Sequence, residues 1–528
     1  MLVTGTLLIL SVLLLATLLI WRRRHFSYFK RIGIPGPKPS LIWGNLREYH
    51  SMEIYKVIGK WLDQYGDIVG FYNGDAPFVV TRDINFVEHI FVRNFQNFVD
   101  RGFTMMTDQM HPVLKKSIMH VGGLPWKSIR SSVTYGMSAN KLKQMMPHLE
   151  EDANIFIKSL EKHADTGEEV LMIRKLEELS MDYVARGSFG IDERFQGNPD
   201  HPLVAIAKAT LRGTMKGPLH KIAQSTTAFG LLMKPFYWLS PLLGEYTFEN
   251  LNKQTAKVIQ LRKSNPSLRK PDILQNLLDA EYVEAEEERG DYKVGNGSVR
   301  SRALTTEEII NASSVLFIAG FETTATALSY IFFALAKHPD VQEKLRQEVI
   351  DAIGTNGSLD YETVMKKLKY LEKVVDEGLR LYPPGLTFVT RQAKEDFEYN
   401  GIKFKAGTNF MAAQYQILTD SRYFSNPMEF NPDRYSPGNE ASFTKAAHIP
   451  FGVGPRNCVG MRLALLKIRY TVARMVQKYR LELGPSQKGT MELSQYAMVS
   501  TPARGPWIVL HSLANERCGS DSHYSHCK

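Results

Sequence analysis

Cysteine is nearly absent from this sequence. Only three cysteines occur in 528 residues, and two of them, Cys518 and Cys527, lie at the C-terminal end. A disulfide framework is therefore excluded, and the composition favours a reducing compartment. No Cys-x-x-Cys pair and no cluster of histidines accompanies the third cysteine, Cys458, so zinc, iron–sulfur and c-type haem sites are not indicated.

A large excess of charge of one sign is also missing. The net charge is +10 at pH 7, which is small for this length. It suits a membrane surface or an acidic protein partner better than nucleic acid. The sequence has no internal repeats, and its 44% hydrophobic content is ample for one large core or two domains.

Charged residues are absent from Leu2 to Trp21, a run of twenty residues that is long enough to cross a bilayer as a helix. Arg22-Arg23-Arg24 follow at once, and the positive-inside rule predicts that the body of the protein faces the cytosol. A cleaved secretory signal is the alternative, but it lacks both a basic segment before the run and a small-residue cleavage site after it. We therefore predict an uncleaved anchor over residues 2–21. A basic, proline-rich spacer over residues 22–39 follows, stiffened by Ile34-Pro35-Gly36-Pro37-Lys38-Pro39.

Cys458 stands where a glycine-rich loop, Phe451 to Gly460, meets a helical pattern that runs from Met461 to about Tyr479. A helix N-terminus carries unpaired N–H groups and partial positive charge, and Arg456 adds a fixed cation, so we expect a thiolate with a lowered pKa. The glycines allow close backbone approach. A lone cysteine is otherwise more often a small buried hydrophobe. The loop predicts one rigidly held thiolate facing a flat ligand.

The ten residues Phe451 to Gly460 resemble the haem-binding signature of the cytochrome P-450 family, Phe-Gly-x-Gly-x-Arg-x-Cys-x-Gly, without a gap. The resemblance implies haem b with its iron held by the thiolate of Cys458, a ligand that favours O–O cleavage. It also implies that Phe451 packs against the sulfur side of the haem and that Arg456 contacts a propionate. The resemblance extends from near Pro35 to near Leu510, and its motifs are most similar to the animal microsomal clan that includes family 3A.

A long apolar helix carries the second motif. Thr305 and Glu308 form a capping box, and the helix is expected to end at Lys337, before Pro339. Its middle, Ala319 to Thr326, contains three threonines, a glycine and a glutamate, which are unusual inside an apolar helix. A packing notch against a neighbouring helix is one interpretation of this composition.

The resemblance gives the other interpretation, because Ala319 to Thr323 match the family's Ala-Gly-x-Glu/Asp-Thr motif. It implies a distorted turn over the haem, in which Ala319 and Gly320 make room for dioxygen. Thr323 would hydrogen-bond the bound oxygen, and Glu322 would relay protons.

Several arginines are assigned to the haem propionates by the resemblance alone. Trp126 and Arg130 lie four residues apart on one helix face, and spacing by itself indicates only a tryptophan packed beside a surface arginine. The family uses this pair to hold propionates. Arg391, after an expected strand over Leu386 to Val389, and Arg101 are further propionate ligands that the resemblance implies.

Glu377 and Arg380 lie three residues apart on an expected helix, Leu371 to Leu381, and by spacing alone form an ordinary surface pair. In the family such a pair joins an arginine from a Pro-x-Arg segment, here Arg434, and braces the loop that carries the thiolate.

The remaining segments carry less information. Residues 140–280 are mainly helical by pattern, and the apolar stretch Phe229 to Leu243 is either core or a second membrane-touching element. Glu284 to Arg302 reads as a solvated loop. Met491 to Val509 predicts strands with a turn into the pocket at Met498 to Thr501, and residues 513–528 are expected to be a disordered polar tail.

Taken together, these features predict a mainly α fold with a small β-rich part, a catalytic domain over residues 40–512 and an endoplasmic reticulum membrane location. The resemblance implies a monooxygenase that inserts one atom of dioxygen into a lipophilic xenobiotic, steroid or fatty-acid-like substrate. NADPH would supply electrons through NADPH-cytochrome P-450 reductase, with cytochrome b5 as a second partner and no nucleic acid partner. The alternatives are a haem-thiolate peroxide isomerase of the same fold and a non-catalytic haem sensor or carrier, and Glu322 and Thr323 argue against both.

Overall fold

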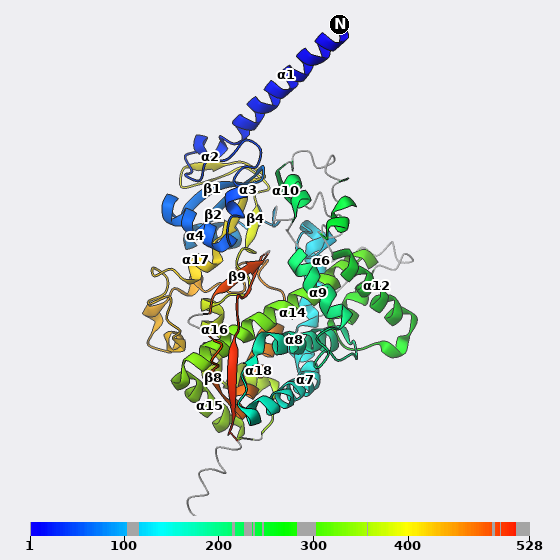
Figure 1. Ribbon diagram of the computed structural model, residues 1–528, viewed down its shortest axis with the longest axis vertical. Helices are drawn as coiled ribbons and strands as arrows, with labels where there is room; N and C mark the ends of the chain where they lie inside the picture. The colour runs from blue at the N-terminus through cyan, green and yellow to red at the C-terminus, as the bar shows by residue number, and fades with distance from the viewer. Residues whose placement is uncertain are drawn as a thin grey trace, which may run out of the picture.

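A computed structural model describes residues 2–102, 116–213, 217–225, 227, 235, 238–244, 248–281, 303–355, 357–487, 491–496 and 498–513. One helix, α1 (Leu2–His25), projects from the end of a mainly helical body (Figure 1). The described elements confirm the predicted fold class of a mainly α protein with small sheets.

The helices of the body cover most of the chain. In order they are α2 (Tyr28–Arg31), α3 (Leu46–Tyr49), α4 (Ile54–Tyr65), α5 (Ile84–Glu88), α6 (Gly123–Gly136), α7 (Ala139–Thr166), α8 (Met172–Phe189), α9 (Pro202–Gly213), α10 (Pro218–Ser225), α12 (Phe248–Ser264), α13 (Ile273–Leu278), α14 (Thr306–Lys337), α15 (Pro339–Ile353), α16 (Lys369–Leu381), α17 (Gln414–Leu418) and α18 (Met461–Lys478). Short 3-10 or π turns are η1 (His89–Arg93), η4 (Ser240–Leu243), η5 (Pro266–Leu268), η7 (Thr363–Lys367), η8 (Pro432–Tyr435), η9 (Glu440–Ser442) and η10 (Lys445–Ala447).

The strands form small sheets beside the helices. They are β1 (Ile68–Asn73), β2 (Ala76–Thr81), β3 (Val170–Leu171), β4 (Thr390–Gln392), β5 (Phe397–Tyr399), β6 (Ile402–Phe404), β7 (Asn409–Ala412), β8 (Tyr479–Leu483), β9 (Leu493–Tyr496), β10 (Val499–Pro502) and β11 (Trp507–Ser512). The largest sheet has the order β1-β2-β7-β4, in which β2 and β7 run parallel. A second sheet has the order β3-β11-β8, and β5-β6 and β9-β10 form hairpins.

Helix α14 is the central element and packs against α8, α12, α16 and α18. The predicted capping box is confirmed, because Thr305 Oγ1 accepts from the N–H of Glu308 while the Glu308 carboxylate accepts from the N–H of Thr305. The helix ends at Lys337 as predicted. The helix is apolar and long enough to span a membrane, but 78% of its most apolar stretch is buried inside the body. It is therefore the core helix of the protein.

Two predictions about the segments 386–389 and 498–501 need correction. Residues 386–389 do not form a strand, since β4 begins at Thr390. Gly385 makes a single bridge to Val499, and Leu386 N donates to Met498 O, so this segment crosses β10 at one point instead of pairing along it. Most of the predicted turn at 498–501 is the strand β10.

The N-terminal segment also differs from the expected spacer. Helix α1 continues to His25, a second short helix α2 follows, and Phe29 and Ile34 are buried. Gly70 N donates to Pro35 O over 2.9 Å, so the proline-rich stretch lies along β1. The segment 22–39 therefore packs on the body and is not a free linker between the body and helix α1.

Three sequence predictions fall wholly or largely outside the described residues. They are the solvated loop over Glu284 to Arg302, the polar tail from residue 514 onward and most of Phe229 to Leu243.

Candidate functional site

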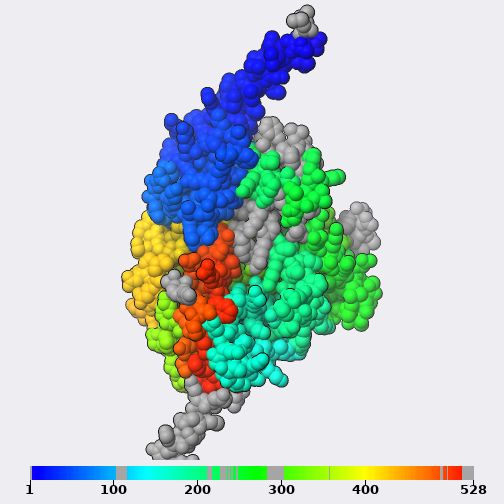
Figure 2. Space-filling model, in the orientation of Figure 1, coloured from blue at the N-terminus to red at the C-terminus, as the bar shows by residue number. Residues whose placement is uncertain are grey.

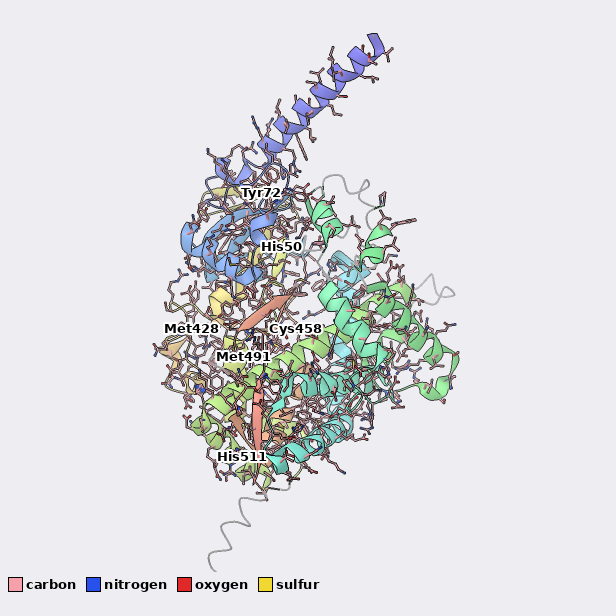
Figure 3. The ribbon with its side chains drawn as sticks, viewed as in Figure 1. His50, Tyr72, Met428, Cys458, Met491 and His511 are labelled. Atoms are coloured by element: carbon pink, nitrogen blue, oxygen red, sulfur yellow. The ribbon has the colours of Figure 1, made fainter. Side chains whose placement is uncertain are left out.

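A cavity of about 330 Å³ lies between α14, α18 and the loop that carries Cys458. Figure 3 shows Cys458 near the centre of the body. The predicted site residues in the cavity wall are Arg101, Trp126, Arg130, Ala319, Glu322, Thr323, Arg391, Phe451, Arg456 and Cys458. Most of the other lining residues are apolar, and Met119, Phe388 and Met498 are among them.

The loop geometry presents the sulfur of Cys458 to this cavity. Cys458 N donates to Phe451 O over 2.9 Å, and Asn457 N donates to Gly454 O over 3.0 Å, so the loop closes on itself. Helix α18 begins at Met461, with Gly460 as its N-cap, which confirms the predicted loop-to-helix junction. Cys458 is accessible from the cavity although protein surrounds it.

The predicted lowering of the thiol pKa is wrong for the protein chain alone. Burial raises the pKa of the Cys458 thiol, and this effect outweighs the N–H of Gly460 and the guanidinium groups of Arg130 and Arg101, which act in the opposite direction. A thiolate at this position therefore needs a stronger positive charge than the surrounding side chains supply. A metal ion bound to the sulfur provides such a charge.

Four arginines, Arg101, Arg130, Arg391 and Arg456, surround one part of the cavity. Burial lowers the pKa of each, and repulsion from the neighbouring guanidinium groups adds to this for Arg101, Arg391 and Arg456. The one carboxylate with a described ion pair to this cluster is Asp100, 3.9 Å from Arg456. Among the described residues, the Nε atoms of Arg101, Arg391 and Arg456 are buried and have no hydrogen-bond partner.

The terminal nitrogens of these arginines hold neighbouring backbone segments. Arg101 donates to Phe388 O and Arg456 O, over 2.7 and 3.0 Å. Arg456 donates to Val121 O over 2.6 Å, and its guanidinium lies 4.4 Å from the ring centroid of Trp126. Trp126 thus stacks with Arg456, a contact across the chain that helix spacing did not indicate.

This donor set fits haem. Its flat apolar ring would fill the mostly apolar cavity, its two carboxylates would offset the buried guanidinium groups, and its iron would pair with the thiolate of Cys458. The same residues offer no comparable partner for a purely apolar ligand, because the cations would then stay buried without a counter-charge.

Another part of the cavity wall comes from the middle of α14. Ala319 is exposed to the cavity although most of its helix is buried, and Glu322 and Thr323 also line the cavity. The helix is continuous here, and the predicted distortion of the turn stays a prediction. Two threonine hydroxyls bond back to the preceding turn: Thr323 Oγ1 donates to Ala319 O, and Thr324 Oγ1 donates to Gly320 O over 2.9 Å.

Gly320 has a packing role in addition to its place in the cavity wall. A Cβ atom at this position would lie 2.9 Å from Val184 Cγ2, so the missing side chain allows α14 to approach α8 closely. The packing-notch interpretation therefore holds for Gly320, while Ala319 faces the cavity.

Glu377, Arg380 and Arg434 do not line the cavity, but they form a fully buried cluster. The Glu377 carboxylate accepts from Arg380 Nε and Nη2, over 2.8 and 2.9 Å, and from Arg434 Nε over 2.9 Å. Arg380 also donates to Leu418 O and Pro427 O. The cluster thus fixes the irregular segment between α17 and η8, and its support of the thiolate loop is a prediction that follows from this position.

Sequence reasoning missed two polar residues that hold the thiolate loop, Asn457 within it and Gln414 on α17. Arg130 donates to both the carbonyl and the side chain of Asn457. Gln414 donates to Ile449 O and Pro450 O, both over 2.9 Å, immediately before Phe451. Asn457 lay inside the quoted motif without a role, and no spacing in the sequence connects Gln414 to the loop.

Comparisons with known proteins agree with this arrangement. The family model described as Cytochrome P450 matches residues 34–509. Cytochrome P450 3A14 of Cavia porcellus is 30% identical over 88% of this chain and 89% of its own length. Cytochrome P450 6B1 of Papilio polyxenes is 30% identical over 92% of this chain and 95% of its own length, and Cytochrome P450 3A41 of Mus musculus is 29% identical over 93% and 94%.

Proposed function

The chain belongs to the cytochrome P450 family of haem-thiolate monooxygenases, and we propose that it inserts one atom of dioxygen into a lipophilic small molecule with electrons from NADPH. The other oxygen atom leaves as water. A xenobiotic, a steroid or a fatty-acid-like compound matches the apolar lining of the cavity.

One observation carries this proposal. Cys458 and the Ala319–Thr323 turn line the same mostly apolar cavity, with four arginines at one part of its wall. When bound, the haem supplies the oxygen activation and the electron transfer. The chain supplies the thiolate, the cations for the propionates and a wall that keeps water from the reacting centre.

Glu322 and Thr323 have the proposed role of moving protons to the reacting centre. Glu322 is 3% exposed, and both residues face the cavity from consecutive positions on α14. A buried carboxyl group and a hydroxyl in sequence are groups that hold and pass a proton. Neither a sensor nor a peroxide isomerase requires such a pair.

The proposed electron donor is NADPH-cytochrome P-450 reductase, docking on the side of the body nearest Cys458, with cytochrome b5 as a second partner. Exposed cations on the elements that hold the thiolate loop support this, including Lys127 on α6 and Arg462 on α18. A cationic face attracts an acidic partner and speeds its association.

The proposed location is the endoplasmic reticulum membrane, with α1 as a single anchor and the body in the cytosol. The anchor is apolar along its length, and none of its apolar window is buried in the body. The described part of Phe229 to Leu243 supports the membrane-touching interpretation. Trp238 and Leu242 are 76% and 80% exposed, and Leu239 and Leu243 are exposed beside them.

The direct test is spectroscopic and kinetic. The reduced protein treated with carbon monoxide is expected to show the red-shifted Soret band of a thiolate-ligated haem, and Cys458→Ser is expected to lose it. Turnover of a lipophilic substrate is expected to require NADPH and reductase. Turnover on an endoperoxide without a reductase would identify the isomerase, and haem binding without turnover of any oxygenase substrate would identify the sensor.

A further inference from the structure

Arg22 joins the end of the membrane anchor to the catalytic body through a buried guanidinium group, and His25 adds a contact from the same helix end. We propose that Arg22 and Asp75 fix the angle between α1 and the body, and so place the surface of Trp238, Leu239, Leu242 and Leu243, here called the apolar edge, against the same lipid bilayer. The inference rests on the membrane location given under the proposed function.

The Arg22 side chain points into the body instead of toward lipid headgroups. It is 7% exposed, whereas Arg23 and Arg24 on the same helix end are exposed. Its Nε donates to Leu41 O over 2.8 Å and its Nη2 donates to Ile42 O over 2.7 Å. Both terminal nitrogens donate to Ser225 O, each over 3.2 Å, and Nη1 lies 3.7 Å from Asp75 Oδ2.

Asp75 connects the other side of the junction. It lies at the tip of the β1–β2 hairpin and is 3% exposed. Its Oδ1 accepts from Thr227 N over 3.1 Å and from Thr227 Oγ1, and its own N–H donates to Gln224 O over 3.2 Å. His25 Nε2 lies 2.6 Å from Asp75 O. One hairpin tip therefore holds both the end of α1 and the end of α10.

This junction determines the direction of α1, because the apolar stretch before it is not buried against the part of the body that the structure describes. None of the apolar window of α1 is buried, and Figure 1 shows the helix projecting freely. After Arg22 in the sequence, the aromatic rings of His25, Phe26 and Phe29 contact Tyr72 and fix the chain on the body. Figure 3 labels Tyr72 at the base of the anchor. A guanidinium that donates in several fixed directions holds an angle, whereas a flexible ammonium or an apolar side chain does not.

The apolar edge lies a short distance along the chain from the residues that Arg22 and Asp75 hold. Ser225 and Thr227 precede it in the chain, and green surface, the colour of this part of the chain, lies beside the blue anchor end of the body in Figure 2. Its four large apolar side chains are exposed. A lipid surface is the occupant that we assign, because the edge shares the anchor end with a helix whose length and composition suit a bilayer.

The experiment measures the depth of the apolar edge in full-length, haem-loaded protein in phospholipid nanodiscs. Leu242→Cys carries a nitroxide label in a Cys518→Ser, Cys527→Ser background, and the label's relaxation by lipid-soluble oxygen is compared with that by a water-soluble nickel chelate. With Arg22 present we expect the label to be accessible to oxygen and protected from nickel. Arg22→Met and Asp75→Asn are expected to reverse this preference.

The matched control is Arg23→Met, which removes the same charge from an exposed neighbouring position and is expected to leave the label in lipid. All variants must keep the thiolate-type carbon monoxide spectrum, which separates lost orientation from lost folding. For a membrane-partitioned substrate, we expect Arg22→Met to raise KM several-fold with kcat unchanged in nanodiscs, and to leave KM unchanged in detergent micelles.

Three results would overturn the inference. The first is a label that stays in lipid in both Arg22→Met and Asp75→Asn, and the second is an equal loss of lipid contact in Arg23→Met. The third is a label that lies in water already with Arg22 present, which would overturn the lipid assignment of the apolar edge. The accessibility of the label does not depend on turnover. An error in the proposed oxygenase function is therefore detected separately, by the carbon monoxide spectrum and the NADPH requirement of the protein.

Discussion

Arg130 donates hydrogen bonds from both of its terminal nitrogens to Asn457, the residue before the thiolate. Nη1 reaches the Asn457 carbonyl over 2.6 Å, and Nη2 reaches its Oδ1 over 2.8 Å. The helix α6 is thereby tied to the thiolate loop by a forked contact, and the same guanidinium opposes the larger effect of burial, which raises the pKa of the Cys458 thiol. One arginine thus serves both the position and the charge of the sulfur.

Replacing this fork is expected to weaken haem binding. Arg130→Lys keeps the charge but offers a single flexible point of donation, so the contact with Asn457 loses its direction. Each hydrogen bond to a charged group contributes about 1.5–3 kcal/mol. We expect faster haem loss to apomyoglobin and a growing fraction of the carbon monoxide complex without thiolate ligation. Lys127→Arg, on the exposed face of α6, is the control and should bind haem normally. An unchanged rate of haem loss in Arg130→Lys would show that the forked contact with Asn457 does not help to retain haem.

Gly454 and Gly460 stand in the same loop but have different steric surroundings. Gly454 has a φ of +75°, and a Cβ atom there would lie 1.9 Å from Phe91 O. At Gly460 the nearest atom to a new Cβ would be Met137 Cε at 3.9 Å. We expect Gly454→Ala to abolish haem incorporation because the loop cannot close, and Gly460→Ala to retain it. The ratio of Soret to protein absorbance of the purified variants measures both, and equal haem content in the two would refute the steric argument.

The sequence predicted those parts of the structure that local patterns encode. The N-cap and the end of α14, the start of α18 and an apolar helix over residues 2–21 follow from residues close together in the chain, and each was found where expected, although the apolar helix α1 continues to His25. The catalytic, cofactor-binding and metal-ligating residues were predicted from motif resemblance, and all ten of them line one cavity. The prediction of a strand over 386–389 was wrong because the conformation of this segment depends on contacts with Met498 and Val499, which lie more than a hundred residues away in the chain.

The thiol pKa and the inward turn of Arg22 could not be read from the sequence for a similar reason. Both depend on burial, which the folded chain creates from distant segments. A helix N-terminus and a nearby arginine do favour a thiolate, but the sequence contains no measure of how much water the fold removes. Likewise, three consecutive arginines after an apolar helix look equivalent until the hairpin tip at Asp75 selects one of them.

Glu377 and Glu343 begin two Glu-x-x-Arg pairs with opposite environments. The Glu377 carboxylate is fully buried and accepts from Arg380 and Arg434, whereas the pair Glu343–Arg346 lies on the surface of α15. Removing one partner of a buried ion pair costs about 3–5 kcal/mol, because the other charges stay buried without a partner, while an exposed pair contributes about 0–1 kcal/mol. We expect Glu377→Gln to lower the free energy of unfolding by several kcal/mol and to reduce haem content. Glu343→Gln should leave both nearly unchanged in urea titrations, and equal losses would show that burial is not the deciding factor.

Thr323 places a hydroxyl on the cavity face of α14, beside the buried carboxyl group of Glu322. If these groups deliver protons to the reacting centre, removing the hydroxyl without changing the side-chain shape slows that delivery. Thr323→Val does so, and we expect NADPH consumption to continue while product per NADPH falls several-fold and hydrogen peroxide accumulates. Thr323→Ser keeps the hydroxyl and is expected to preserve most of the coupling, which separates proton delivery from packing. The measurement is the share of consumed NADPH and oxygen that appears as product and as hydrogen peroxide, determined in one reaction. An unchanged yield in Thr323→Val would mean that protons reach the centre by another route and that the hydroxyl serves only its bond to Ala319 O.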